Sequence, residues 1–355
     1  MPNENLITNE NRITNERSIS KANMRGFLEH LSKDRTLVGP VDTGKVVEYR
    51  ETVASEVLMD DRVTYNSIKS YYFPQTELMF TFENEEVEDN TNIHSYAIFG
   101  ARPCDMQALK VMSVVYTTGK YADPFFQRRY EANFLIGVGC INSKPECFCH
   151  EMGVDREYSD FCDILLKDDG ESYSIEHLSE KGSSALREYM TEGRFLCHMD
   201  MTVFATLEPS PCLVKHAKKT DEPSPSLDPD KDDTAYFDII DWAKATEACK
   251  GCGICTYICP TCYCFDFKDV SQKGVAKRYK CWDSCMYPKF TLHASGHNPR
   301  EHRYERYRQR VLHKYKYVPA NFDGCVACTG CGRCVRGCPV GINIKDILMQ
   351  ITKHE

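Results

Sequence analysis

The sequence contains no run of about 18 consecutive apolar residues, so no membrane-spanning helix is expected. It begins with a polar segment rather than a basic region followed by an apolar run, so no secretory signal is expected either. Basic residues number 44 against 52 acidic ones, and the net charge of −8 disfavours nucleic acid as a partner. No Gly-x-Gly-x-x-Gly fingerprint follows a candidate strand, so a bound NAD or FAD is not indicated.

Cysteine is instead frequent, with 20 copies in 355 residues. In a chain without an export signal, this number predicts metal ligation in a reducing compartment, the cytoplasm, rather than disulfide bonds. Apolar residues make up 42% of the chain, which is enough to form a core and excludes disorder throughout. A chain of this length is expected to fold as two or three domains.

The cysteines fall into two groups along the chain. Seven occur in residues 1–215 and thirteen between Cys249 and Cys338, and the segment between the groups is rich in Pro, Ser and Asp. Such a composition is typical of a linker. The expected organisation is a polar tail (1–20), an α/β domain with a Cys-ligated metal site (21–216), a linker (217–236) and an α+β ferredoxin-like domain (237–355) with an insertion (265–322).

Two short apolar runs in the first domain, residues 96–101 and 134–139, are continuous rather than alternating, as in buried parallel strands. Between them, residues 105–115 carry Met and Leu at spacings of three, which predicts an amphipathic helix that Asp105 could cap. A strand, a helix and a second strand form a right-handed crossover unit with parallel strands. Sites in such α/β sheets form beyond the carboxyl ends of the strands.

Four cysteines follow these two strands within a few residues and are expected to converge at one edge of the sheet: Cys104, Cys140, Cys147 and Cys149. Four thiolates can hold a 4Fe-4S cluster or a structural zinc ion, whereas isolated buried cysteines are commonly free thiols. Because four thiols share one edge, we favour a metal site. The two ferredoxin-type runs described next give the rest of the chain an iron–sulfur character, so we favour a 4Fe-4S cluster here, the third of the chain. His150 is a candidate substitute ligand.

Two further cysteine runs have the spacing of bacterial ferredoxins, Cys-x2-Cys-x2-Cys-x3-Cys-Pro, beginning at Cys249 and at Cys328. This triple spacing differs from the paired Cys-x2-Cys of zinc sites, so two 4Fe-4S clusters are predicted. In two-cluster ferredoxins the fourth cysteine of each run binds the other cluster. The expected ligand sets are Cys249, Cys252, Cys255 and Cys338 for the first cluster, and Cys328, Cys331, Cys334 and Cys259 for the second.

The insertion region contains four more cysteines, Cys262, Cys264, Cys281 and Cys285. They could form an additional iron–sulfur or zinc site, or they could be structural thiols, and the spacing favours neither interpretation. The other cysteines are expected to be packing residues: Cys162, Cys197, Cys212 and Cys325.

Residues 300–316 are strongly basic in an otherwise acidic chain, and the basic side chains repeat at helical spacing. Three interpretations are open. The stripe could be a solvated helix face, a docking surface for an acidic partner protein, or a positive field that raises the potential of nearby clusters.

Iron–sulfur clusters move single electrons, and the sequence offers no pattern for a two-electron centre such as a nickel–iron site, sirohaem or a dinucleotide cofactor. We therefore predict an electron-transfer subunit in which electrons hop between clusters while the chemistry lies on partner chains. The alternative is a self-contained sulfur or disulfide reductase that uses Cys264 or Cys285, near a cluster, as a redox-active thiol.

Several longer motifs accompany the two ferredoxin runs: Phe99-Gly-Ala-Arg-Pro-Cys104-Asp105, Gly139-Cys140, Cys147-Phe-Cys149, Cys259-Pro-Thr-Cys262-Tyr-Cys264, Trp282-Asp-Ser-Cys285 and Gly296-His-Asn298-x-Arg300. With these motifs the chain, over roughly residues 25–350, resembles a family of iron–sulfur electron-transfer proteins. This family includes the iron–sulfur subunit of anaerobic sulfite reductase and the beta subunit of cytoplasmic sulfhydrogenases. Cys281 departs from the family pattern.

The resemblance implies a subunit that carries electrons between a flavin subunit, which oxidises NAD(P)H, and a terminal reductase subunit. The terminal subunit in this family is a sirohaem sulfite reductase, a nickel–iron hydrogenase or a heterodisulfide-reductase-like module.

Overall fold

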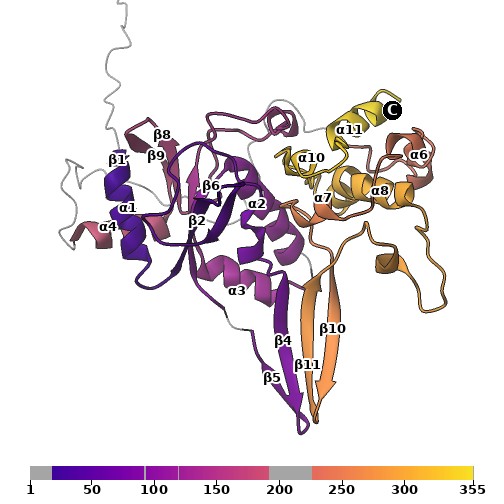
Figure 1. Ribbon diagram of the computed structural model, residues 1–355, viewed down its shortest axis with the longest axis horizontal. Coiled ribbons are helices and arrows are strands. Elements are labelled where there is room, and N and C mark those ends of the chain that lie inside the picture. The colour runs from indigo at the N-terminus through magenta and orange to yellow at the C-terminus, as the bar shows by residue number, and fades with distance from the viewer. Residues whose placement is uncertain (1–17, 92, 119, 192–225, 355) are drawn as a thin grey trace, which may run out of the picture.

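The computed structural model describes residues 18–91, 93–118, 120–191 and 226–354, which form two β-sheets, their covering helices and a C-terminal helical region (Figure 1). No helix among these residues is long and apolar enough to cross a membrane. Cys197 and Cys212, which were expected to be packing residues, lie outside the described residues.

The larger sheet has seven strands in the described part of the chain. Their spatial order is β1 (Ser18–Ser20), β9 (Ser172–Leu178), β8 (Ile164–Asp168), β7 (Phe134–Val138), β6 (Tyr96–Ala101), β2 (Thr36–Asp42) and β3 (Val47–Glu51). The central strands β8, β7, β6 and β2 pair in parallel, whereas β1, β9 and β3 pair antiparallel. The predicted α/β character with parallel strands is therefore confirmed, and the two expected strands are β6 and β7.

Helices cover both faces of this sheet. One face carries α1 (Lys21–Leu31) and α4 (Glu180–Thr191), and the other carries η1 (Ile68–Tyr71), α2 (Pro103–Thr117) and α3 (Pro124–Ala132). Successive strand residues point to opposite faces, so Phe99 belongs to the core under α1 and Ile98 to the core under α2. The predicted helix lies within α2, and Met106 and Leu109 on its apolar face are buried as expected.

The second sheet extends away from the body as a narrow arm (Figure 1). Its strands, all antiparallel, are β10 (Phe265–Gln272), β11 (Val275–Trp282), β4 (Thr76–Glu83) and β5 (Glu86–Asp89). Two strands come from the expected insertion and two from the expected first domain. At the base of the arm, the rings of Phe73 and Trp282 stack with centroids 5.9 Å apart. The sequence patterns did not predict this pairing.

The C-terminal region consists of short helices: η3 (Asp233–Tyr236), α6 (Trp242–Ala245), α7 (Ile254–Tyr257), η4 (Pro288–Thr291), α8 (Arg303–Leu312), the π-helical turn η5 (His313–Tyr317), α9 (Val318–Asn321), α10 (Arg333–Arg336) and α11 (Ile344–Thr352). Their core also includes Met152 from η2 (His150–Met152) of the first domain. Leu227 and Tyr236 are fully buried in it. The described part of the expected linker is therefore packed rather than free, because it contributes two apolar side chains to this core.

The described end of the expected polar tail is also ordered. Residues Ser18–Ser20 form β1 and pair with β9, and Ile19 is buried in the sheet core. The expected boundary at residue 20 therefore falls at the end of a strand that belongs to the α/β sheet.

Candidate iron–sulfur centres

The two ferredoxin-type runs fold in the same way. Each has a loop carrying its first two cysteines, then a four-residue helix, α7 or α10, that contains the third cysteine and ends shortly before the fourth. The loops turn through positive φ angles of 66° and 77° at Gly251 and Gly253, and of 60° and 70° at Gly330 and Gly332. Residues with a side chain rarely adopt this backbone conformation, so glycine is required there.

Two cavities lie between the runs. The first is lined by Cys249, Cys252, Cys255 and Cys338, and the second by Cys259, Cys328, Cys331 and Cys334. Each cavity is thus lined by the first three cysteines of one run and the fourth cysteine of the other. Which cluster each cysteine binds stays a prediction. Cys334 borders both cavities, so the two spaces adjoin. Four thiols around each cavity are the donor set that a 4Fe-4S cluster uses, and the residues present therefore fit that group.

The fourth cysteine of each run lines the cavity of the other run because α7 and α10 pack closely together. A Cβ atom on Gly337 would lie 2.4 Å from Cδ1 of Ile258, so the end of each run lies against the other helix. The fourth cysteine, beyond the helix, consequently faces the cavity of the partner run.

The four N-terminal cysteines gather at the carboxyl edge of the larger sheet. Cys104 lies in the first turn of α2, and the other three follow β7. Arg102 donates a hydrogen bond from Nη1 to the Gly139 carbonyl (2.9 Å), which ties the end of β6 to the end of β7. Burial raises the pKa of Cys149, and the nearby charges of Cys147 and Cys140 raise it further. Burial likewise raises the pKa of Cys104, with contributions from the charges of Cys331 and Cys149.

This N-terminal group lies directly against the second ferredoxin run. The Phe148 amide donates to the Gly330 carbonyl (2.7 Å), and Phe148 also lines the second cavity. A Cβ atom on Gly330 would lie 2.5 Å from the Phe148 carbonyl, so only glycine permits this approach. Arg336 Nη1 lies 3.6 Å from Cys147 Sγ. The N-terminal thiols and the two cavities therefore form a continuous row.

A buried ion pair joins the N-terminal group to the second run. Asp105 Oδ1 is 2.7 Å from Arg333 Nη1 and Asp105 Oδ2 is 2.8 Å from Arg333 Nη2, and both side chains have 0% exposure. Asp105 was expected to cap the helix, but α2 begins at Pro103 and its N-cap is Arg102. The carboxylate instead pairs with Arg333 across the boundary between the two expected domains. No spacing pattern in the sequence predicts this pair.

Burial opposes ionisation of several of the candidate ligands. It raises the pKa of Cys331 to about 12 and those of Cys149 and Cys255 to about 11. Iron binds the thiolate, so binding must release these protons, and nearby cations favour that release. Arg333 lowers the pKa of Cys331 and Arg310 lowers that of Cys255, in opposition to burial.

Three of the four insertion-region cysteines gather beside the second cavity. Cys262 donates a hydrogen bond that holds the pKa of Cys259 well below its usual range, and a hydrogen bond from Cys285 lowers the pKa of Cys264 to about 7. Cys281 lies instead in β11, where it is paired with Asp266 of β10 and Thr76 of β4.

Lys69 anchors the Cys262 segment to the first domain. Its Nζ donates to the carbonyls of Tyr257 (3.1 Å) and Cys262 (3.0 Å) and lies 3.9 Å from the Trp282 ring centroid. Burial lowers the pKa of this lysine to about 8. Sequence reasoning missed Lys69 because no local pattern marks it.

Part of the basic stripe of residues 300–316 is buried rather than solvated. Arg306, Arg310 and Lys314 are buried with relative exposures of 5%, 2% and 2%. Arg306 donates to the carbonyls of Met286, Arg300 and Glu301, whereas Arg310 and Lys314 reach the cysteine runs. Burial alone would lower the pKa of Lys314, but the Cys259 and Cys262 thiols raise it, so the charge is retained.

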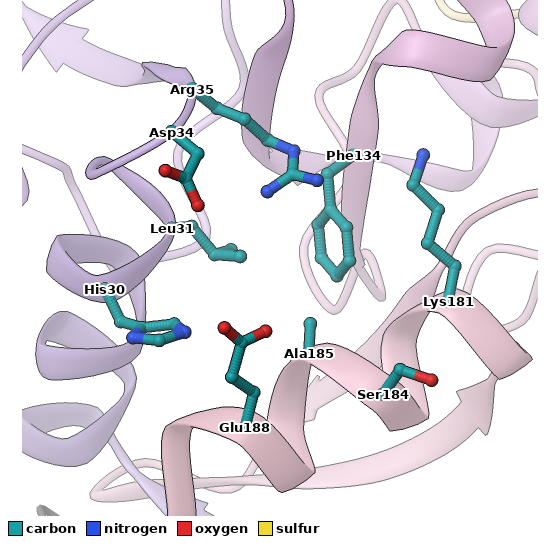
Figure 2. A pocket seen from close by; sticks show the side chains of 9 residues that line it. All are labelled: His30, Leu31, Asp34, Arg35, Phe134, Lys181, Ser184, Ala185 and Glu188. Atoms are coloured by element: carbon teal, nitrogen blue, oxygen red, sulfur yellow. The ribbon is translucent and has the colours of Figure 1, made fainter. Parts of the chain in front are cut away.

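Other sites in the described residues are distinct from the cysteine row. A separate pocket lies between α1 and α4 at the amino end of β7, where Arg35 and Lys181 flank the Phe134 ring (Figure 2). It is thus at the opposite edge of the sheet from Cys140.

No group of three His, Cys, Asp or Glu side chains in the described residues is arranged to hold a single metal ion. Cys162 and Cys325 are half-buried and pack against apolar clusters.

Comparisons with known proteins agree with this geometry. The profile of a family described as a 4Fe-4S dicluster domain matches residues 248–342. The chain is also 30% identical over 335 residues to sulfhydrogenase 2 subunit beta of Pyrococcus furiosus, in an alignment that covers 92% of this chain and 95% of that protein. No solved structure matches the chain significantly.

Proposed function

The chain belongs to the family of iron–sulfur electron-transfer subunits that includes this sulfhydrogenase beta subunit, and we propose that it relays electrons within a multisubunit oxidoreductase. The relay would connect a flavin subunit that oxidises NAD(P)H to a terminal reductase subunit. The terminal partner would be a sirohaem sulfite reductase, a nickel–iron hydrogenase or a heterodisulfide-reductase-like module. The relative's name as a beta subunit supports a complex of this kind.

The observation that carries the proposal is the continuous row of thiol groups. We assign Cys249, Cys252, Cys255 and Cys338 to the first centre, Cys328, Cys331, Cys334 and Cys259 to the second, and Cys104, Cys140, Cys147 and Cys149 to a third. When bound there, 4Fe-4S clusters supply reversible one-electron transfer. The chain's own contribution is to hold the three sets side by side, through Cys334 between the first two and through Phe148 and Gly330 between the second and third.

The relay function is tested by comparing the isolated, reconstituted chain with the complex purified from its native cells. NAD(P)H is expected to bleach the iron–sulfur absorbance of the complex and to leave the isolated chain oxidised, because the chain lacks a dinucleotide fingerprint. Dithionite serves as the control and should reduce both samples. Direct reduction of the isolated chain by NAD(P)H would contradict the relay assignment.

A second candidate function is favoured by the hydrogen-bonded pair Cys264–Cys285. Oxidation of two thiols to a disulfide releases two electrons and two protons. The neighbouring centre carries one electron at a time, so the pair would exchange its two electrons with that centre in two successive one-electron steps. It would make the chain a self-contained sulfur or disulfide reductase. Rapid disulfide reduction by the dithionite-reduced isolated chain, lost in Cys264→Ser and kept in Cys281→Ser, would favour this function over the relay.

The third centre is tested by metal analysis of the reconstituted chain. We expect about 12 Fe per chain, and about 8 Fe after Cys149→Ala, because each 4Fe-4S cluster contributes about four. Cys162→Ala is the matched control, since this half-buried cysteine belongs to none of the three sets, and it should retain about 12 Fe. A wild-type result of about 8 Fe with about one Zn would instead make the N-terminal site structural zinc.

A further inference from the structure

Two buried cations line the second cavity, and one of them also reaches the first cysteine set. Lys314 Nζ is 3.2 Å from Cys259 Sγ and also donates to Thr261 Oγ1 (2.9 Å) and the Ala327 carbonyl (2.9 Å). Arg310, one helical turn earlier, donates from Nη2 to the Cys255 carbonyl (3.1 Å). Both side chains line the second cavity together with Cys334.

The π-helical turn η5 fixes Lys314 in this position. A π turn widens the helix and leaves backbone groups without their usual partners. Here the Lys314 carbonyl accepts from the Ala327 amide (2.9 Å), immediately before Cys328, and the Tyr315 carbonyl accepts from the Leu227 amide (2.8 Å). The helix that carries the cation is thereby attached to the loop that carries the second set.

Neither cation is neutralised by a carboxylate in the described part of the chain. Arg310 Nε and Nη1 are buried there without a hydrogen-bond partner among the described residues, and Lys314 meets only a thiol, a hydroxyl and a carbonyl. By contrast, Lys316, which is equally buried and two residues away, forms an ion pair with Asp233 (2.8 Å). Within the described residues, the charges of Arg310 and Lys314 are therefore not paired with a carboxylate, whereas the charge of Lys316 is.

The lining of the first cavity contains one cation, the exposed Lys250, although Arg310 also reaches the first set at the Cys255 carbonyl. Lys314 is therefore the buried cation specific to the second set. Arg303 also donates to the Cys249 carbonyl, but Arg303 is exposed to solvent. Solvent screens an exposed charge, whereas a buried charge acts through a medium of low dielectric constant. A cluster gains negative charge when it is reduced, so a buried cation stabilises the reduced form and raises the potential.

We propose that Lys314 raises the reduction potential of the second centre above that of the first, making it the preferred resting place of an electron within the ferredoxin-type pair. This inference rests on the proposed assignment of the two cysteine sets. It selects the third interpretation of the basic stripe, a positive field at the clusters, for Lys314.

The test is an EPR-monitored redox titration of the reconstituted chain. The signal absent from Cys331→Ala identifies the second centre. Lys314→Met keeps the aliphatic stem and removes the charge, and it should reduce the second centre's equilibrium constant for accepting an electron at least tenfold, about 59 mV for a one-electron couple. Lys316→Met is the matched control and should change it less than threefold. Lys314→Arg should retain most of the wild-type potential.

Iron content separates failure of this inference from failure of the cluster assignment. A wild-type potential in an iron-replete Lys314→Met chain would overturn the inference while leaving both cysteine sets intact. An equal shift of both centres would also overturn it, because the asymmetry would be absent. If Lys314→Met binds less iron, Lys314→Gln decides the matter, because the amide carries no charge and can still donate a hydrogen bond.

Discussion

Replacing Cys338 with alanine is expected to remove the centre formed by the first run and to leave the centre of the second run in place. Cys338 belongs to the second run in sequence, but it lines the cavity of Cys249, Cys252 and Cys255. Iron should fall by about 4 per chain, and electron transfer through the chain should be abolished, because a gap is left in the row. Alanine is used because serine can still ligate iron.

Double variants identify which centre is lost. Cys338→Ala combined with Cys252→Ala should lose no more iron than either change alone, about 4 per chain, because both residues serve one centre. Cys338→Ala combined with Cys331→Ala should lose about 8, because two centres are affected. The reverse pattern would show that each run binds its own cluster, and the exchange of fourth ligands would be refuted. Cys259→Ala offers the reciprocal measurement.

The cysteine sets could be predicted from the sequence because their geometry is local. Three thiols at spacings of three, followed by Cys-Pro, enclose a cavity once glycine permits the tight loop, and the structure brings together the sets expected from spacing. The strands β6 and β7 were predictable for a similar reason, since continuous apolar runs between turn residues indicate buried strands. Both predictions depend on residues that are close neighbours in the chain, except for the fourth cysteines, whose exchange between the runs was expected from two-cluster ferredoxins.

What could not be predicted depends on partners that are far apart in the chain. Asp105 and Arg333 are 228 residues apart, and a carboxylate in a first helical turn is ordinarily interpreted as a cap. The periodicity of the basic stripe indicated a helix, but it did not show that the charged side chains would face the interior. Arg and Lys are rarely buried without specific partners, and those partners lie far away in the chain. The pairing of β4 with β11 likewise joins segments that carry no mutual signal.

Replacing Asp105 with asparagine is expected to destabilise the reconstituted chain strongly. The change leaves the fully buried Arg333 guanidinium without its counter-charge, and breaking a buried pair of this kind costs about 3–5 kcal/mol of the free energy of unfolding. In a chain of this size the unfolding midpoint should fall by roughly 5 °C. Circular dichroism during thermal unfolding measures the midpoint, and iron analysis before heating verifies that the compared samples carry the same clusters.

An exposed ion pair provides the control. Arg278 and Asp269 on the arm form a bidentate pair at 2.8 and 2.7 Å, but the side chains are 44% and 58% exposed. Asp269→Asn should leave the midpoint nearly unchanged, because solvent replaces the lost interaction. The double variant Asp105→Leu with Arg333→Met should be more stable than Asp105→Asn, since no buried charge is then left unpaired. Equal stability of Asp105→Asn and the wild type would show that the pair does not hold the N-terminal group against the second run.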